Sequence, residues 1–415
     1  MIKQLLCITL TMFSVHVFAQ PVLQTGDTTM PSVWIDKVTH HKVVRLSNIP
    51  GNSLSFYFHN NPFIGNKMVF YNNSKAKGAQ ESEKIRVAQP SSNVFDKQIW
   101  TIDLANQQTE KITNLSTPMG GEIVSGKSGN IYFQIKDSVF RVNAQTKEVK
   151  FIFVFPPEYK GSIATVNADE TLLAGSKASD AQKEIVKKYP AKHEFFDRIF
   201  DAKLPNDLFT INIAKGAIEK IHTENTWLGH VQFSPTEPNL LMFCHEGPWH
   251  KLDRIWTIDL KTKQVKLMHQ RTMDMEIAGH EWFSADGQTI WYDLQMPKGQ
   301  KFYVAGTNVH TGVEVKYELQ RDEWSIHFNS TKNNTGFCGD GGDPSQVAKA
   351  KNGQFIYLFK PSGNTMKAEK LVDMRFHDYK LEPNVHFSPD DQWVIFRANF
   401  EGIDAIYAVE VQKSK

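Results

Sequence analysis

The chain has 415 residues, a formal net charge of +2, 22% charged residues and 12% aromatic residues. This balance is typical of a globular protein, and it argues against a disordered chain or a protein that coats nucleic acid. The length allows a large hydrophobic core but does not fix the number of domains, because repeat folds of this size form single units.

Residues 1–19 have the features of a secretory signal peptide. Lys3 gives the start a positive charge, an apolar run extends through Phe18, and Ala19 is a small residue at the expected cleavage point. The apolar run is too short to favour a transmembrane anchor. We therefore expect cleavage after Ala19 and a periplasmic or secreted product with no membrane partner. Two cysteines remain in that product, too few for a disulfide framework, and the sequence leaves their pairing open: Cys244 and Cys338.

A polar turn followed by a short apolar strand recurs seven times along the chain. The copies lie at 66–70, 129–133, 169–173, 239–243, 288–292, 334–338 and 392–396. Each copy is followed by a second strand of similar character, at 99–104, 139–142, 208–213, 255–260, 302–305, 355–358 and 406–409. Polar turns then lead into a further short strand, which gives three to four strands per unit. This repetition predicts an all-β fold, a seven-bladed β-propeller in which residues 20–415 form a single domain.

Two segments depart from the repeat. The final unit lacks an outer strand, and residues 43–46 near the N-terminus have the pattern to supply it, which would tie the two ends of the chain together. Residues 176–206 interrupt the third unit, because 183–188 and 194–200 have a helical pattern. We interpret this segment as a short helical insertion in the third blade that packs on its host, with a partner-binding role as the less favoured alternative.

Polar residues recur at one register of the innermost strands, which surround the central channel of a propeller. Three positions before the residue that opens the repeat turn, four consecutive units carry His230, His280, His327 and Asn384. Glu382 shares a face with Asn384 because side chains alternate along a strand, and His59 occupies the comparable approach in the first unit. A single histidine at a strand end is more often structural than a ligand, but the coincidence over four blades indicates one pocket. The remaining histidines that we interpret as surface or structural residues are His250, His269, His310 and His377.

The most charged stretch of the chain, 243–256, lies between two strand patterns. Gly247-Pro248 cannot continue a strand, so we expect a loop here, where a rigid scaffold commonly carries its chemistry. Its candidate functional residues are His245, Glu246, Trp249, Lys251 and Arg254.

This stretch carries a resemblance to a known family. The run from His245 to His250 with 254–256, preceded by 227–230 and followed by 279–282, resembles the oligogalacturonate lyases, which are pectin-degrading lyases built on a seven-bladed propeller. The resemblance continues through 339–341 and 400–407 and covers most of the mature chain. It implies a Mn²⁺-dependent β-elimination with His245 as the base and His280 as a metal ligand. The chain departs from the family in the last blade, where a His-x-His pair falls on Glu382 and Asn384 and a glutamine ligand falls on Tyr379.

The residue types also suit this chemistry directly. β-Elimination of a 4-linked uronide removes the C5 proton, and a cation that neutralises the adjacent carboxylate assists as a Lewis acid. A neutral histidine is a suitable base. We therefore predict His245 as the base, with His230 as its competitor. The predicted ligands of a divalent cation, Mn²⁺ or alternatively Ca²⁺ or Zn²⁺, are His280, His327, Asn384 and Glu382.

A uronic-acid oligosaccharide is the expected partner, with no nucleic acid. The predicted substrate contacts are Arg254, Lys251, His59 and Trp249. Arg254 is equally well interpreted as a structural ion-pair partner of Asp253 or Glu246, and core packing is the commoner fate of a tryptophan. Two other function classes stay open. A propeller glycoside hydrolase would need two carboxylates, for which Glu246 and Glu281 are the candidates, and a non-catalytic carbohydrate-binding or scaffold propeller would need neither.

Overall fold

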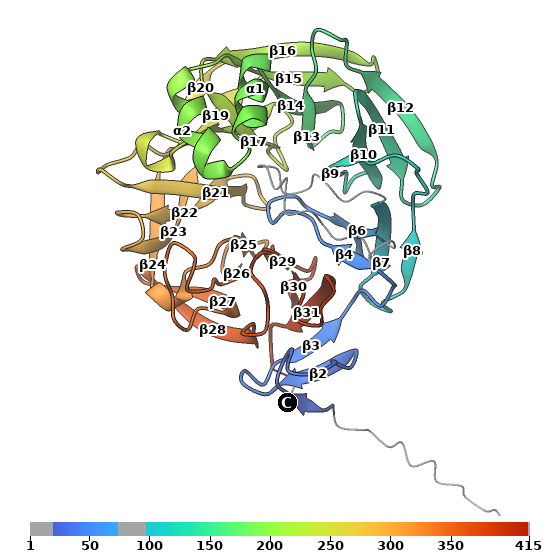
Figure 1. The fold of residues 1–415 in the computed structure, drawn as a ribbon, viewed down its shortest axis with the longest axis vertical. Helices are drawn as coiled ribbons and strands as arrows, with labels where there is room; N and C mark the ends of the chain where they lie inside the picture. The colour runs from blue at the N-terminus through green and yellow to red at the C-terminus, as the bar shows by residue number, and fades with distance from the viewer. Residues whose placement is uncertain (1–19, 74–96, 414–415) are drawn as a thin grey trace, which may run out of the picture.

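The computed structural model describes residues 20–73 and 97–413. Its strands form antiparallel sheets arranged as a ring around a central axis (Figure 1). One eight-stranded sheet consists of two four-stranded halves that are joined by a single parallel pairing, Glu318 with Thr365. With these halves counted separately, the described strands form a β-propeller whose topology is consistent with the seven blades that the repeats predict.

The blades follow one another in chain order. The first comprises β4 (Asn52–Leu54), β5 (Phe63–Ile64), β6 (Lys67–Asn73), β7 (Gln98–Asp103) and β8 (Thr109–Lys111). The second comprises β9 (Gly120–Val124), β10 (Asn130–Ile135), β11 (Ser138–Asn143) and β12 (Val149–Val154). The third comprises β13 (Ser162–Val166), β14 (Leu172–Ala178), β15 (Asn206–Asn212) and β16 (Ala217–Glu224). The fourth comprises β17 (Trp227–Phe233), β18 (Leu240–Glu246), β19 (Ile255–Asp259) and β20 (Val265–Leu267).

The fifth blade comprises β21 (Ile277–Phe283), β22 (Thr289–Gln295), β23 (Phe302–Asn308) and β24 (Glu314–Leu319). The sixth comprises β25 (Phe328–Ser330), β26 (Phe337–Gly339), β27 (Phe355–Ser362) and β28 (Thr365–Asp373). The last comprises β29 (His386–Phe387), β30 (Trp393–Ala398), β31 (Ala405–Glu410), β3 (Lys42–Arg45), β2 (Val33–Asp36) and β1 (Val22–Leu23). The repeat strands and their partners predicted from the sequence are the second and third strands of these blades.

The N-terminal strand β3 closes the ring as predicted. It pairs antiparallel with the C-terminal strand β31, with Val44 opposite Ala408 (Figure 1). The joint is packed as well as hydrogen-bonded, because the fully buried Trp34 of β2 lies edge-on to Tyr407 at 6.0 Å. The chain ends therefore contribute to one shared blade.

The predicted insertion in the third blade is present between β14 and β15 as two helices, α1 (Asp180–Lys188) and α2 (Lys192–Ala202). Pro190 separates them, since proline cannot continue a helix interior. Phe195 is buried, and its ring lies 6.0 Å from that of Trp227 on β17. The insertion thus packs against the fourth blade as well as its own.

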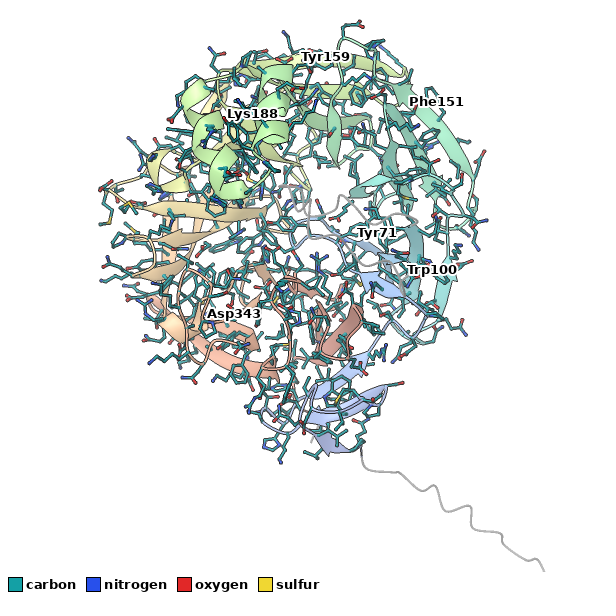
Figure 2. The ribbon with its side chains drawn as sticks, in the orientation of Figure 1. Tyr71, Trp100, Phe151, Tyr159, Lys188 and Asp343 are labelled. Carbon is teal, nitrogen blue, oxygen red and sulfur yellow. The ribbon has the colours of Figure 1, made fainter. Side chains whose placement is uncertain are left out.

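The side chains divide between the packed interior of the ring and its rim. Figure 2 shows Tyr71 towards the centre and Phe151 of β12 at the outer edge, where Phe151 is 58% exposed. Cys244 and Cys338 are buried free thiols, which settles the question of their pairing. No helix in the described part of the chain has the length and apolar character needed to cross a membrane.

Candidate active site in the central channel

A segment of the first blade, between β4 and β5, reaches the far side of the ring. The ring of Tyr57 lies 5.9 Å from that of His230 and 5.1 Å from that of His327. The ring of Phe58 stacks on His327 at 4.7 Å and lies edge-on to His280 at 6.1 Å. These contacts reach the fourth, fifth and sixth blades, so this segment, Tyr57–His59, crosses the central channel. We call it the crossing segment.

Hydrogen bonds from several blades hold the crossing segment in place. The N–H of Tyr57 donates to Glu122 Oε2 of β9 (2.8 Å), and the N–H of Phe58 donates to Asn384 Oδ1 (3.0 Å). The amide of Asn329 donates to the Phe58 carbonyl (3.1 Å). Because three blades anchor its backbone, the crossing segment fixes the position of the His59 imidazole.

Four histidines surround this segment and form what we call the histidine cluster: His59, His230, His280 and His327. The rings of His59 and His230 are 5.6 Å apart, and those of His280 and His327 are 4.8 Å apart. Four buried imidazole nitrogens in the cluster have no hydrogen-bond partner in the described structure: His59 Nδ1, His230 Nδ1, His280 Nδ1 and His327 Nε2. A buried polar atom without a partner costs about 1–3 kcal/mol, so their concentration in one place indicates a ligand site.

The backbone confirms that these residues share a register. His230, His280 and Asn384 all have a positive φ, at 47°, 50° and 52°. Each of the two histidines lies at a register shift in the innermost strand of its blade. This conformation is unfavourable for residues other than glycine and concentrates at functional sites. The repeated bulge turns each side chain out of the regular alternation of its strand.

Burial keeps part of the cluster neutral. Burial, with nearby His230 acting in the same direction, lowers the pKa of His59 to about 3. Burial also places the pKa of His280 well below its ordinary value, with His327 acting in the same direction. At neutral pH these two imidazoles therefore carry lone pairs rather than charge, which is the form that binds a metal.

Arg254, which the sequence predicts as a substrate contact, lies at the centre of a buried ionic network. Its guanidinium donates to both oxygens of Glu246 (2.8 and 3.0 Å) and both of Glu281 (3.1 and 3.3 Å). The Arg254 side chain is only 1% exposed. With its donors used by two carboxylates, Arg254 has the structural role that the sequence left open as the alternative.

The same network argues against a glycoside hydrolase. Burial alone would raise the pKa of Glu246 and of Glu281, but Arg254 and His230 hold both below the ordinary glutamate value. A hydrolase needs one carboxylic acid whose pKa is raised so that it keeps its proton. These carboxylates are both ionised at neutral pH and lack that property.

His230 is the cluster histidine that lies beside this network. Its Nδ1 is 2.8 Å from Glu281 Oε1, a close contact whose direction does not satisfy a hydrogen bond, and its Nε2 is 3.6 Å from Glu246 Oε1. The side chain of His230 is 21% exposed. A carboxylate beside one imidazole nitrogen is the arrangement that orients a general base.

His245, the first choice for the base from the sequence, lies elsewhere. Its Nε2 contacts Glu224 Oε2 of β16 at 3.0 Å, and its ring stacks on Trp256 at 4.9 Å. Side chains alternate along β18, so Cys244 and Glu246 face the network of the fifth blade while His245 faces the third blade. The structure therefore does not bring His245 into the histidine cluster.

The two predicted metal ligands of the last blade, Glu382 and Asn384, differ in their surroundings. Glu382 Oε2 lies 3.8 Å from His327 Nε2. The amide of Asn384 accepts from Phe58 and donates to the Glu382 carbonyl (3.0 Å), so its hydrogen bonds hold the crossing segment rather than leaving it free for a cation. Tyr379 is buried and its hydroxyl donates to the Asp340 carbonyl (3.1 Å).

Two other predicted substrate contacts lie at the edge of the site. The ring of Trp249 is 5.2 Å from His280, and its Nε1 donates to Glu246 Oε2 (3.2 Å). Lys251 Nζ lies 3.4 Å from Asp197 of α2, and its side chain is half exposed. Trp249 is therefore positioned beside the histidine cluster, and Lys251 is directed to the insertion.

A second histidine site is structural, as predicted. His269 is buried, with Nδ1 2.7 Å from Glu314 Oε2 and Nε2 2.8 Å from Glu276 Oε1. Burial opposes its protonation, but the two glutamates raise the pKa of His269 above its ordinary value. The pair of ion contacts anchors the loop that leads into β21.

The donor set of the cluster fits a divalent cation. The imidazoles of His280 and His327 each leave a buried nitrogen unpartnered, and Glu382 adds a carboxylate close to His327. Within residues 20–73 and 97–413, however, no group of three or more His, Cys, Asp or Glu side chains lies close enough together to hold a metal ion as it stands. Imidazole with carboxylate is the ligand combination of a borderline transition metal.

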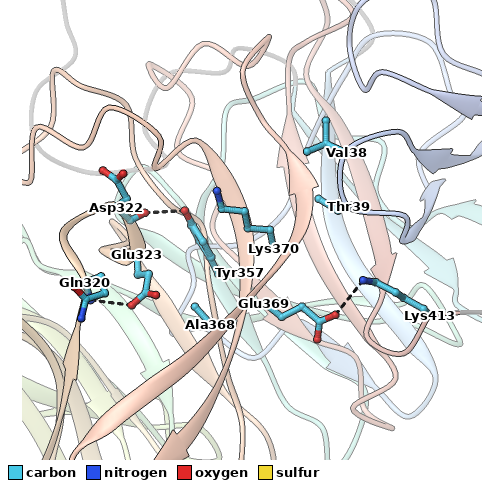
Figure 3. A pocket seen from close by; sticks show the side chains of 10 residues that line it. All are labelled: Val38, Thr39, Gln320, Asp322, Glu323, Tyr357, Ala368, Glu369, Lys370 and Lys413. Carbon is cyan, nitrogen blue, oxygen red and sulfur yellow. Dashed lines mark hydrogen bonds and ion pairs between the residues drawn. The ribbon is translucent and has the colours of Figure 1, made fainter.

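A cavity of about 500 Å³ lies away from the histidine cluster (Figure 3). Its walls come from the turn between β2 and β3, the 3₁₀ turn η2 (Arg321–Glu323), β27, β28 and Lys413. Glu369 and Lys413 form an ion pair within it (3.5 Å). No residue of the histidine cluster lines this cavity, so we do not place the chemistry there.

Sequence reasoning missed several residues of the site. Tyr57 and Phe58 precede His59 directly, and their aromatic character was the available signal, but their place across the channel depends on contacts more than 170 residues away. Glu281 was considered only as a hydrolase acid. The His327 partner Asp340 (2.9 Å from Nδ1) lies in the run 339–341 that carries part of the family resemblance, but the sequence assigned it no role.

Comparisons with known proteins give one consistent result. A sequence model of the oligogalacturonate lyase family matches residues 81–415. An oligogalacturonide lyase of Pectobacterium atrosepticum is 25% identical over 332 residues, which cover 76% of this chain and 83% of the relative. A solved oligogalacturonate lyase in complex with manganese superposes with a TM-score of 0.74 at 20% identity, covering 92% of this chain and 96% of the other. An oligogalacturonate lyase from Vibrio parahaemolyticus superposes equally well, with a TM-score of 0.74, 21% identity and the same coverage.

Proposed function

Because this chain belongs to the oligogalacturonate lyase family, we propose that the histidine cluster is its active centre and that it cleaves oligogalacturonate by metal-assisted β-elimination. The family assignment confirms the resemblance carried by the motif at His245, and the protein is a lyase that acts on pectin oligosaccharides. The observation that carries the proposed location is the group of unpartnered imidazole nitrogens around the crossing segment.

His230 is the base in this proposal. It is partly exposed, it lies within the cluster, and Glu281 stands beside its Nδ1. In the reaction the C5–H bond breaks and His230 takes the proton, the electron pair forms the C4–C5 double bond, and the C4–O4 bond breaks. The leaving oxygen takes up a proton from water. A positioned base typically contributes about 10²–10⁴-fold to the rate.

Mn²⁺ is the proposed cation, held by His280, His327 and Glu382. A bound cation supplies Lewis-acid neutralisation of the uronate carboxylate, which acidifies the C5 proton. The support for these ligands is the unpartnered buried nitrogens of His280 and His327, the pKa of His280 that burial lowers, and the Glu382 carboxylate 3.8 Å from His327 Nε2. Metal analysis of the purified protein and of His280→Ala tests the ligand set, and unchanged metal content in the variant would contradict it.

Three further residues are proposed to contact the uronide. His59 lies in the cluster on the anchored crossing segment, and Trp249 lies beside His280 with an indole suited to a sugar face. Lys251 is half exposed, and its ion pair with Asp197 is of the weak surface kind that a substrate carboxylate can replace.

We also propose that residues 20–415 act as a single propeller domain and that residues 1–19 are a cleaved signal peptide, which would give a periplasmic or secreted enzyme. The support is the basic start, the apolar run and the small residue Ala19. Residues 1–19 lie outside the described structure. N-terminal sequencing of protein from its native host tests the cleavage, and an intact Met1 would contradict it.

The assay for the function follows the new double bond. Trigalacturonate incubated with the protein should gain ultraviolet absorbance from the unsaturated uronide, and a chelator should abolish the gain until Mn²⁺ is restored. Reducing ends that appear without ultraviolet absorbance would instead show hydrolysis. No cleavage at any metal concentration would favour a non-catalytic carbohydrate-binding propeller.

A further inference from the structure

Arg397 of β30 is a buried cation beside the active centre. It is 6% exposed, and its side-chain partners are two neutral carbonyl oxygens. Nε donates to the carbonyl of Glu382 (2.8 Å), and Nη1 donates to the carbonyl of Ser55 (3.0 Å). In the described part of the chain, no carboxylate lies within 4.0 Å of its guanidinium.

This charge state is unusual for a buried arginine. The other large buried guanidinium, Arg254, is neutralised by two carboxylates in direct contact. A buried charge without a paired counter-charge is costly, and proteins normally pair it or bind an ion to it. Burial lowers the pKa of Arg397, although more distant carboxylates such as Glu122 raise it. The residue remains a cation, and its direct counter-ion does not come from the described chain.

The position of Arg397 identifies where such a counter-ion would lie. Ser55 begins the stretch that runs into the crossing segment at Tyr57, and the Glu382 carboxylate is 3.8 Å from His327 of the histidine cluster. Arg397 thus joins the two chain segments that bring the first and last blades to the channel. An anion in contact with its guanidinium would be next to the cluster.

We propose that Arg397 binds the carboxylate of the uronate whose C5 proton is removed. This inference rests on the proposed lyase function and adds a catalytic residue to it. A guanidinium matches a carboxylate in geometry and can bind it with two parallel hydrogen bonds. As the C5–H bond breaks, negative charge develops on that carboxylate, and a fixed cation in a dry site stabilises it without reorganising. Arg397 forms no covalent bond and keeps its protons throughout.

Thermal unfolding with D-galacturonate tests binding without requiring catalysis. Galacturonate should raise the melting temperature of the metal-loaded protein, and galactose, which lacks the carboxylate, should not. In Arg397→Gln the dissociation constant for galacturonate should rise about 10- to 100-fold, the value of hydrogen bonds to a charged group. The matched control is Arg45→Gln, which removes an arginine of the same sheet that is already paired with Glu401 (3.3 Å), and this variant should keep the full shift.

Activity distinguishes failure of the inference from failure of the function. If wild type forms unsaturated product but Arg397→Gln binds galacturonate equally well and keeps its kcat, Arg397 has only a structural role and the inference is overturned. If galacturonate protects wild type and not Arg397→Gln but no double bond appears, the uronate site stands and the lyase proposal fails. Should Arg397→Gln not fold, Arg397→Lys, which retains the charge, must show a reduced increase in melting temperature with galacturonate. The inference would also be overturned if galactose raised the melting temperature of wild type as much as galacturonate does.

Discussion

Replacement of Arg254 by methionine tests whether this residue is a structural ion or a substrate clamp. Arg254→Met keeps much of the side-chain volume but removes four hydrogen bonds and the shared counter-charge of Glu246 and Glu281. Loss of one partner from a buried ion pair costs about 3–5 kcal/mol. Because all three side chains are less than 10% exposed, solvent screening does not reduce this value, and we expect the full range at pH 7.

The loss should depend on pH in a defined direction. In the folded wild type the pKa values of Glu246 and Glu281 are lowered, so their ion pairs contribute stability above the unfolded glutamate pKa, about 4.3. That contribution disappears as the pH falls through the folded values. In Arg254→Met the buried carboxylates of Glu246 and Glu281 have lost the guanidinium that neutralised them. Protonation at lower pH removes their charge and so reduces the cost of burying them. The difference in free energy of unfolding should therefore be largest at pH 7 and shrink towards pH 4.

Urea unfolding followed by tryptophan fluorescence at pH 7 and pH 4 measures both quantities. Lys160→Met is the matched control, since Lys160 and Asp137 are 49% and 41% exposed and their ion pair should contribute less than about 1 kcal/mol. The reasoning would be refuted if Arg254→Met unfolded within about 0.5 kcal/mol of wild type while its KM for trigalacturonate rose strongly. That outcome would restore Arg254 as the substrate clamp.

Three further predictions concern the surroundings of the site. His269→Gln should cost more stability at pH 5.5 than at pH 9, because the raised pKa of His269 gives stability that is present below the unfolded value and lost as pH rises; a pH-independent difference in urea unfolding would contradict this. Asn384→Ala should lower the free energy of unfolding by about 1–3 kcal/mol, because it leaves the buried N–H of Phe58 without an acceptor. An unchanged stability together with a lower metal content would instead make Asn384 a metal ligand. Gly279→Ala should reduce kcat/KM with little unfolding, since its Cβ would lie 2.8 Å from Trp249; normal turnover would place Trp249 outside the site.

The fold was predictable because its evidence is local and repeated. Each turn-and-strand unit is recognisable within a few residues, and the pattern at 43–46 could supply the outer strand that the final blade lacked. The confirmed pairing of Val44 with Ala408 follows from that deficit. The shared register of His230 and His280 was visible for the same reason, since counting from the repeat turn locates the innermost strand in every blade.

The parts of the site that sequence could not supply depend on side-chain direction and on distant contacts. The strand β18 continues through His245 and Glu246, so these neighbours face different blades, and a motif that treats them as one loop cannot tell which enters the channel. The hydrogen-bond donors of Arg254 are used by two carboxylates only because Glu281, which comes from another blade, accepts from them. In the sequence, Arg397 is one polar residue in an otherwise apolar strand. Only the structure shows that it is buried with no carboxylate of the described chain in contact.

The kcat of two histidine variants is the most direct test of the active centre. His230→Ala should lower kcat for unsaturated product by about 10²–10⁴-fold with unchanged metal content and thermal stability close to wild type, because His230 lies in the cluster beside Glu281. His245→Ala, which removes a contact with Glu224 on the face towards the third blade, should retain most of the turnover. If instead His245→Ala abolished the reaction while His230→Ala kept near-normal kcat, the base would be His245 and the active centre would not be the histidine cluster.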